Sequence, residues 1–419
     1  MATRALNPTA PIAIESRALV PGPAAITAMV IVLAAWYLNA VISWRQAALF
    51  IVGASAGVVL YHAAFGFTSA WRVFIADRRG AGLRAQMLML AITCVVFFPL
   101  LASGTFMGQP LRGSVSPIGV GVAAGAFIFG LGMQLGGGCA SGTLFSVGGG
   151  STRMLITLFF FIIGSVIGTA HMGFWTAQPA FAPTSIVTTM GPWAALAASL
   201  ALFGAIAWMT TIAEKKRHGR LVDQPPALSE RQRAVGALSR VEGRWLTGPW
   251  PLVAGAVGLA VVNIATLTIG GRPWGVTSAF ALWGAKWFAA LGVDVASWSY
   301  WTTPAQATAL KSSVLMDVTS VMDFGIILGA LLAAILAGRF APVLKISLRS
   351  LAAAVIGGLL LGYGARIAYG CNIGAYFSGI ASGSLHGWLW LVAAFAGNVF
   401  GTRLRPMFDL NVEKTRTAC

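Results

Sequence analysis

Two of the chain's four cysteines lie inside short glycine-rich segments, and their thiols are the groups in this sequence best suited to chemistry. A thiol is a weak, polarizable hydrogen-bond donor, which suits a soft solute that carries sulfur. The glycines allow close approach of the backbone, and free N–H groups at the start of a short helix favour an anion. We therefore predict a site for a sulfur-bearing anion that contains Gly137, Gly138, Cys139, Ser141, Gly142, Thr143, Gly370, Cys371, Asn372 and Gly374.

The segment around Cys139 recurs around Cys371 at a constant offset. Gly130-Leu-Gly132 precedes the first cysteine at the same spacing at which Gly362-Tyr-Gly364 precedes the second. A second pair of matching segments lies upstream, one in each half of the chain. Two motifs in the same order indicate an internal duplication. The upstream pair extends the predicted site by Gly66, Thr68, Ser69, Gly275, Thr277 and Ser278.

Each cysteine can also be interpreted as a small hydrophobic residue packed between helices. This interpretation suits Cys94, which is alone in an apolar stretch, and Cys419 offers no argument for a function. A disulfide between Cys139 and Cys371 is disfavoured, because reducing cytoplasm would face at least one of them. Neither has His or acidic neighbours at the spacing of a metal site, so we expect no metal and no cofactor.

Composition places these motifs in a membrane. Hydrophobic residues are 57% of 419 and charged residues only 9%, whereas a soluble domain has roughly 25% charged residues. The apolar runs have the length of membrane helices and lack the short alternation of a β-barrel. The sequence therefore predicts an all-α polytopic membrane protein with spans at 24–43, 46–64, 85–102, 116–133, 153–170, 188–212, 250–269, 320–338, 348–364 and 385–402.

Four segments between these spans are too short or too rich in glycine to cross a bilayer alone. They are 65–76, 134–150, 274–290 and 370–384, and each contains one of the motifs. Non-helical backbone at membrane depth is tolerated only inside protein or beside a water-filled path. We therefore expect the motifs to meet where the two repeats contact each other, as in transporters.

Basic residues follow the motifs differently in the two halves. The loop 171–187 after the first Cys motif is uncharged, whereas 403–416 after the second is basic. Basic loops stay in the cytoplasm, so the halves are predicted to be inverted repeats. The predicted division is a cytoplasmic tail at 1–23, an extra span at 24–45, repeat one at 46–213, a basic cytoplasmic linker at 214–248, repeat two at 249–402 and a cytoplasmic tail at 403–419.

The net charge of +17 is explained mostly by this bias and needs no nucleic-acid partner. Membrane lipids, and a cytoplasmic sulfur-carrier protein at the linker, are the partners that it would suit. Arg366 differs in charge from its counterpart in the first half, Gln134. We predict that Arg366 draws the anion inward. Snorkelling to the outer interface, or holding a helix C-terminus, is the alternative.

No motif identifies a driving force. A phosphate loop for ATP is absent from the sequence. Buried carboxylates often mark proton pathways, but we expect both Asp317 and Asp323 at the outer start of a span. His62, His171 and His386 are expected to be capping or interfacial residues near span ends.

The segments around both cysteines resemble the YeeE/YedE family of bacterial sulfur transporters, over about residues 46–402. The resemblance implies an inner-membrane importer in which short re-entrant helices form an hourglass path. It also implies that the thiols of Cys139 and Cys371 relay the solute by hydrogen bonds. Family members are associated with thiosulfate or with other sulfur or selenium species. Some relatives have further cysteines in the segments matching 66–69 and 275–278, where this chain has hydroxyls.

The predicted function is import of a small sulfur-containing anion, with thiosulfate as the first candidate, by a protein that is not an enzyme. The alternative is a membrane sulfurtransferase that carries a persulfide on Cys139 or Cys371. Such an enzyme needs a thiolate and an exposed acceptor site, and neither cysteine has an adjacent cationic or His partner in the sequence. A scaffold that does not transport is a third interpretation.

Overall fold

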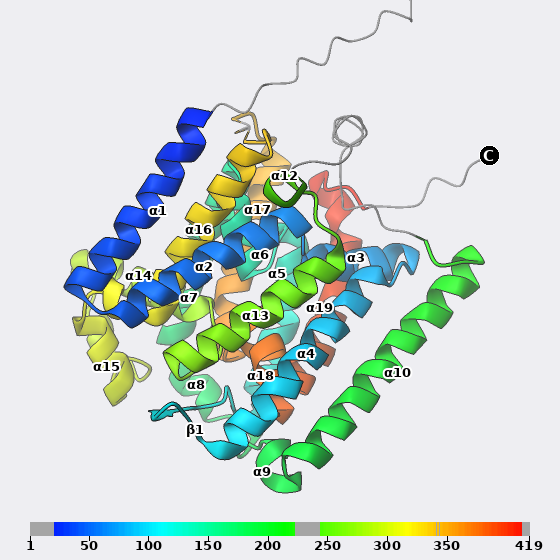
Figure 1. Ribbon diagram of the computed structural model, residues 1–419, viewed down its shortest axis with the longest axis horizontal. Helices are drawn as coiled ribbons and strands as arrows, with labels where there is room; N and C mark the ends of the chain where they lie inside the picture. The colour runs from blue at the N-terminus through cyan, green and yellow to red at the C-terminus, as the bar shows by residue number, and fades with distance from the viewer. Residues whose placement is uncertain (1–20, 223–243, 341, 343, 413–419) are drawn as a thin grey trace, which may run out of the picture.

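The computed structural model describes residues 21–222, 244–340, 342 and 344–412, which Figure 1 shows as a ribbon. Within these ranges the chain is a bundle of helices with very little β-structure. The predicted N-terminal tail, most of the basic linker and the end of the C-terminal tail with Cys419 lie outside the described residues.

Each of the predicted spans coincides with a long helix, so the prediction of an all-α polytopic membrane protein is confirmed. Nine helical segments of the described chain are long and apolar enough to cross a membrane. The helix α19 is not among them, because His386 and Asn398 lower its mean hydropathy. The long helices are α1 (Pro21–Val41), α2 (Trp44–Ala63), α4 (Ala81–Ser103), α5 (Val120–Gly136), α7 (Thr152–Ala170), α10 (Pro192–His218), α13 (Leu252–Gly270), α16 (Val318–Leu336), α17 (Leu348–Ile367) and α19 (Leu385–Leu404).

Short elements join these helices. Two small antiparallel pairs, β1 (Thr105–Phe106) with β2 (Gln109–Pro110) and β3 (Ile118–Gly119) with β4 (Ala180–Phe181), were not expected. The second pair delays the start of α5, which was predicted at residue 116. The short helices are α3 (Phe67–Asp77), α6 (Ala140–Gly148), α8 (Met172–Thr176), α9 (Ile186–Met190), α12 (Arg244–Thr247), α14 (Thr277–Ala290), η1 (Val295–Ser297), α15 (Pro304–Lys311), η2 (Val314–Met316), η3 (Asn372–Phe377), α18 (Ser378–Ala381) and η4 (Arg405–Phe408).

Two groups of long helices form the centre of the bundle, and each combines helices from both halves of the chain. In one group, α17 packs against α5 and α7, and α19 packs against α5. In the other, α2 packs against α16 and α13, and α13 packs against α4. The short helices follow the same rule, since α3 contacts α4 and α19 while α14 contacts α16 and α7. These contacts are symmetric between the two halves. If α2, α4, α5 and α7 are exchanged, in this order, with α13, α16, α17 and α19, each contact described above between these long helices becomes a contact of the same set.

Glycines let these helices approach closely. A β-carbon on Gly130 of α5 would meet the backbone of Ala394 of α19, and one on Gly329 of α16 would meet the backbone of Ala54 of α2. Small residues are the usual basis of helix contacts in membranes, where burial of apolar surface from lipid gives little driving force. The glycines of the Gly-Leu-Gly sequence before Cys139 therefore belong to helix packing.

The helices α1 and α10 lie at opposite edges of the bundle (Figure 1). The last turn of α10 is held to the start of α4 by Glu214, a residue that we expected in the linker. Its buried carboxylate accepts hydrogen bonds from Arg84 at 2.7 Å and from the N–H of Gly80 at 3.1 Å. Because an acidic side chain is rarely buried unless paired, this contact explains why the helix continues to His218.

Candidate functional site

Cys139 and Cys371 occupy equivalent places in the fold. Each is the N-cap of a short helix that follows a broken long helix, α6 after α5 and η3 after α17. Both residues have extended backbone, with φ of −81° and −106°. The second short helix begins as a π-helical turn and continues as α18, and such turns are frequent at functional sites.

The two thiols are buried and close to each other. Cys139 is 1% exposed and Cys371 is 0% exposed, and the short helices that they cap, α6 and η3, contact each other. The sulfur of Cys139 is 3.4 Å from the Ser141 hydroxyl, and that of Cys371 accepts the Ile373 N–H at 3.4 Å. The fold thus brings together the two motifs that the sequence repeats.

Glycine is required in the turn before each cysteine. Gly137 has a φ of +94° and Gly370 a φ of +150°, conformations that side chains strongly disfavour. At the first turn, Arg153 of α7 donates hydrogen bonds to the carbonyls of Leu135 at 2.6 Å and Gly136 at 2.8 Å, which holds the end of α5. This role of Arg153 was not predicted from the sequence, although a cation at the start of the helix after the motif was a visible signal.

Three motif glycines border open space rather than a neighbouring helix. A β-carbon on Gly275 would meet no other atom within 4 Å, one on Gly374 would lie 4.0 Å from the α-carbon of Gly275, and one on Gly142 would lie 3.5 Å from the Cys139 sulfur. Gly138 is different, because its β-carbon would press on Met154 at 3.0 Å. The structure therefore leaves room beside the first thiol and between the two motifs of the second half.

The hydroxyls of the predicted site differ in their partners. Thr68 is buried and its hydroxyl has no hydrogen-bond partner within the described protein. Ser69 and Thr143 donate to backbone carbonyls at 3.1 Å and 2.8 Å. Thr277 is buried in the first turn of α14. Of the two equivalent segments, the first thus offers the free hydroxyl of Thr68, and Ser69 caps its own turn at Gly66.

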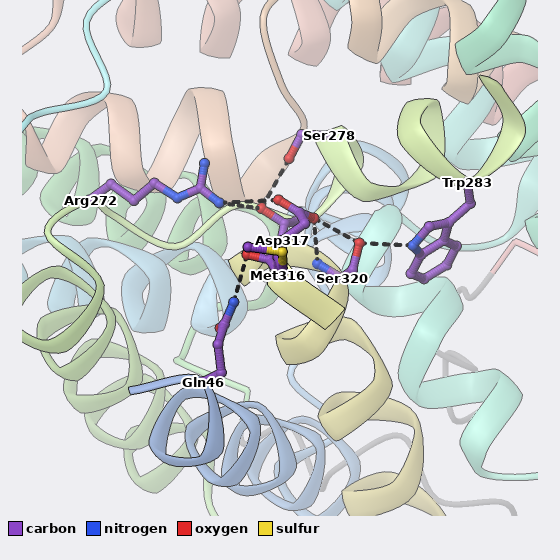
Figure 2. Close-up of polar contacts among 8 residues, drawn as sticks. Gln46, Arg272, Ser278, Trp283, Met316, Asp317 and Ser320 are labelled. Atoms are coloured by element: carbon purple, nitrogen blue, oxygen red, sulfur yellow. Dashed lines mark hydrogen bonds and ion pairs between the residues drawn. The ribbon is translucent and has the colours of Figure 1, made fainter. Parts of the chain in front are cut away.

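A polar network at the start of α16 positions the equivalent segment of the second half (Figure 2). Arg272 lies 3.4 Å from a carboxylate oxygen of Asp317 and donates to the Thr319 hydroxyl at 3.3 Å. Ser278 of α14 donates to the same hydroxyl at 3.0 Å. Asp317 is also the N-cap of α16, where it accepts the Ser320 N–H at 2.8 Å. The network therefore joins the start of α14 to the start of α16.

Two buried polar side chains, one next to Cys371 and one in α16, have no partner within the described protein. Both amide atoms of Asn372 and both carboxyl oxygens of Asp323 lack hydrogen bonds, and both residues are 0% exposed. Asn372 follows Cys371 directly in the chain, and Asp323 lies in the second turn of α16. Buried polar groups are normally satisfied, so exceptions require an explanation. Asp317 is the N-cap of α16, as expected for the start of the span, whereas Asp323 lies inside the helix.

Arg366 is buried in the last turn of α17, where its partners belong to another part of the chain. It donates to the Tyr300 hydroxyl at 2.9 Å, and its guanidinium lies 4.9 Å from the centre of that ring. Gly168 of α7 packs against its aliphatic stem. These contacts tie α17 to the loop after η1, so Arg366 does not contact the thiols directly.

Two amide networks that brace the broken helices were not found from the sequence. Asn263 accepts the Trp274 N–H at 2.9 Å and donates to the Ser378 hydroxyl at 3.2 Å. Gln134 donates to the side-chain oxygen of Asn398 at 2.6 Å. All of these residues are buried. Asparagine inside an apolar span was the available signal, because polar residues are rare there and usually have partners.

The histidines lie near helix ends, as predicted for His62 and His171. His386 is also near the start of α19, but it is 0% exposed and bonds to the Ser384 hydroxyl at 2.6 Å. Within the described residues no group of three or more His, Cys, Asp or Glu side chains is placed to hold a metal ion. The cysteines in the same part of the chain, including Cys94, are free and buried.

Comparison with known proteins identifies the family of the chain. A family model described as sulphur transport matches residues 62–400. The chain belongs to the sulphur transport family. It is 27% identical over 370 residues to the thiosulfate transporter TsuA of Spirochaeta thermophila, covering 83% of this chain and 95% of that protein. It is 26% identical over 364 residues to TsuA of Escherichia coli, covering 83% and 91%.

A shorter match links the chain to the probable transporter YedE of Escherichia coli. The two are 31% identical over 176 residues, which is 42% of this chain and 43% of YedE. The chain thus matches less than half the length of that relative. Family membership confirms the resemblance inferred from the cysteine motifs, and together with the apolar helices it indicates a multi-pass membrane protein.

Proposed function

We propose that this protein imports a small sulfur-containing anion, with thiosulfate as the first candidate, across the bacterial inner membrane. The observation that carries the proposal is the pair of buried thiols, Cys139 and Cys371, at the N-caps of two contacting short helices. Membership in the sulphur transport family supports transport. The relatives similar over most of their length are named thiosulfate transporters, which supports the choice of anion.

The proposed chemistry is an exchange of weak hydrogen bonds. An anion that leaves water needs donors in its place, and the site offers two thiols, the free amide of Asn372 and the free hydroxyl of Thr68. A transport site must bind well enough to admit a solute and weakly enough to release it. Thiols donate weakly, so Cys139 and Cys371 are suited to pass the anion from one to the other.

The proposed architecture is an inverted repeat with an hourglass path. The contacts that persist when the halves are exchanged support two related repeats, and the basic loops support their opposite orientation with both termini cytoplasmic. In this arrangement the short helices after the breaks are re-entrant, and Arg366 acts on the anion from the outer mouth. Membrane lipids, and a sulfur-carrier protein at the linker 214–248, are the proposed partners.

The alternative of a sulfurtransferase is less well supported. A persulfide on Cys139 or Cys371 would have to reach an acceptor, but these thiols are at most 1% exposed. Reactive cysteines usually lie in partly exposed, electropositive surroundings. The burial of both thiols therefore favours passage of a solute over transfer of sulfur to another protein.

Uptake of labelled thiosulfate into proteoliposomes that contain the purified protein tests the proposal. We expect saturable uptake that unlabelled thiosulfate abolishes, and competition by sulfate, sulfite and selenite ranks the anions. Empty liposomes, and liposomes with the Cys139→Ala/Cys371→Ala double variant, are the controls. Uptake no faster than in empty liposomes would refute the assignment to thiosulfate. Uptake of one of the competitors instead would identify that anion as the substrate.

A further inference from the structure

Asp323 is the one acidic side chain among the described residues that is completely buried and has no hydrogen-bond partner on either carboxyl oxygen. Glu214, which is equally buried, has three donors. An ionised carboxylate without donors or a counter-ion is strongly destabilised inside a protein. Acidic residues in membrane helices are rare and commonly mark ion or proton pathways. The position of Asp323 therefore needs a functional account.

The helical repeat places Asp323 on the face of α16 that turns toward the motifs. Thr319, one turn earlier on this face, bonds Ser278 at the start of α14. Ile327 and Ala330, later on the same face, pack against Gly148 at the end of α6. Residues four and seven apart share a helix face. Asp323 thus lies between the start of α14 and the helix that Cys139 caps.

Other charged groups around α16 do not neutralise Asp323. Asp317 interacts with it and carries the same charge when ionised. Arg272 pairs with Asp317 at the N-terminus of the helix. The neighbouring helices α1, α2 and α14 carry the titratable residues Tyr37, Arg45, Tyr61, His62 and Lys286, of which Lys286 donates to the Leu310 carbonyl. In this position Asp323 is therefore more stable with a bound proton than as a carboxylate.

We propose that Asp323 binds the proton that is transported together with the anion, so that the protein is a proton–anion symporter. This inference rests on the proposed function. An anion beside Cys371 repels an ionised carboxylate and accepts a hydrogen bond from a protonated one. Anion and proton therefore favour each other's binding, and such coupling is reciprocal. When the anion leaves toward the cytoplasm, that stabilisation ends and the proton is released on the same side.

Proteoliposomes with a clamped membrane potential and a pH-sensitive dye in the lumen test the inference. We expect thiosulfate uptake by the wild type to acidify the lumen. With the outside one pH unit more acidic, thiosulfate should accumulate about tenfold for each proton carried per anion. Asp323→Asn should exchange labelled for unlabelled thiosulfate at equilibrium but neither acidify the lumen nor accumulate thiosulfate. Asp294→Asn, a change of an exposed loop acid, should behave as the wild type.

If Asp323→Asn does not assemble, Asp323→Glu is the variant that tests the inference, because it keeps a titratable carboxyl group. Proton-coupled uptake by Asp323→Glu supports the inference, and uptake without acidification overturns it. Wild-type uptake with no change in lumen pH, or acidification by Asp323→Asn as in the wild type, also overturns it. Complete absence of thiosulfate uptake by the wild type is a different result, because it refutes the proposed function itself.

Discussion

The Ser141 hydroxyl lies 3.4 Å from the sulfur of Cys139, whereas the equivalent cysteine, Cys371, has a backbone N–H at the same distance from its sulfur. The two thiols thus have different local partners. A sulfur that accepts the Ile373 N–H keeps its own S–H proton for another acceptor. Ser141 can accept a hydrogen bond from Cys139 or donate one to it, so this thiol has a side-chain partner inside the described protein.

Removing either site thiol should reduce uptake strongly. We expect Cys139→Ala and Cys371→Ala each to lower the uptake rate by about tenfold or more, because a buried anion loses one donor. Serine at either position should retain part of the activity, since it keeps a donor. Cys94→Ala, in the interior of α4, is the matched control. Normal uptake by both alanine variants would show that the cysteines only fill space.

Asn372 offers a sharper separation of function from stability. Its amide atoms bond nothing in the described protein, so Asn372→Leu should leave assembly intact while uptake falls. Asn263→Leu is the contrasting change, because that amide is hydrogen-bonded to two residues, Trp274 and Ser378, and it should lower the melting temperature. Thermal unfolding of both variants in detergent, measured beside uptake, checks the pair. If Asn372→Leu took up thiosulfate at the wild-type rate, this amide would not be part of the site.

A side chain on a motif glycine should block transport without disturbing packing. Gly374→Leu would extend into the open space beside Gly275, so we expect folded protein with little uptake. Gly130→Leu would instead press on the backbone of α19, and overpacking of this kind costs about 1–3 kcal/mol or more. Size-exclusion profiles and uptake distinguish the two results. Full activity of Gly374→Leu would place the route of the anion elsewhere.

Arg366 is predicted to attract the anion from the outer side. Arg366→Gln, which copies Gln134 of the first half, should lower the uptake rate at low ionic strength by roughly tenfold. The loss should shrink as salt rises, because screening already weakens the wild-type attraction. Tyr300→Phe, which removes the hydroxyl that Arg366 bonds, controls for a purely structural effect. A loss that is independent of salt and shared by both variants would support the structural role.

The orientation of the chain is open to chemical labelling. On the inverted-repeat proposal, impermeant thiol reagents added outside intact cells should modify a cysteine at Ala177 or Ser299, both exposed in loops. They should not modify one at Lys216, near the end of α10. Cell lysis should make the third position reactive. Labelling of position 216 in intact cells would reverse the predicted topology.

The long helices were predictable because each is a predominantly apolar run bounded by glycine, proline or charge. The joints were harder to predict. Pairing of Ile118–Gly119 with Ala180–Phe181 sets the start of α5, and it depends on chain that is distant in sequence. Glu214 extends α10 by bonding Gly80 and Arg84. Both depend on tertiary partners, which local hydropathy does not report.

The cysteine motifs were predictable because they repeat, and repetition does not depend on knowing the fold. The supporting residues do not repeat. Two of them, Arg153 and Asn263, bond backbone groups of other helices or loops, and Asp323 stands out because its carboxyl has no partner within the described protein. The sequence alone specifies neither property. Conversely, Arg366 was singled out for its charge, and its contact with Tyr300 became visible only in three dimensions.

The mixed helix groups have a consequence for how the protein is made. The helices α2, α4, α5 and α7 are synthesised before α13, α16, α17 and α19, yet each group of packed helices contains members of both sets. Until the later helices insert, the glycine-lined surfaces of α2 and α5 lack the helices that pack against them in the folded protein. Assembly is therefore completed late, once the second half has reached the bilayer. A truncated or stalled chain would expose these surfaces to the proteases that clear unassembled membrane proteins.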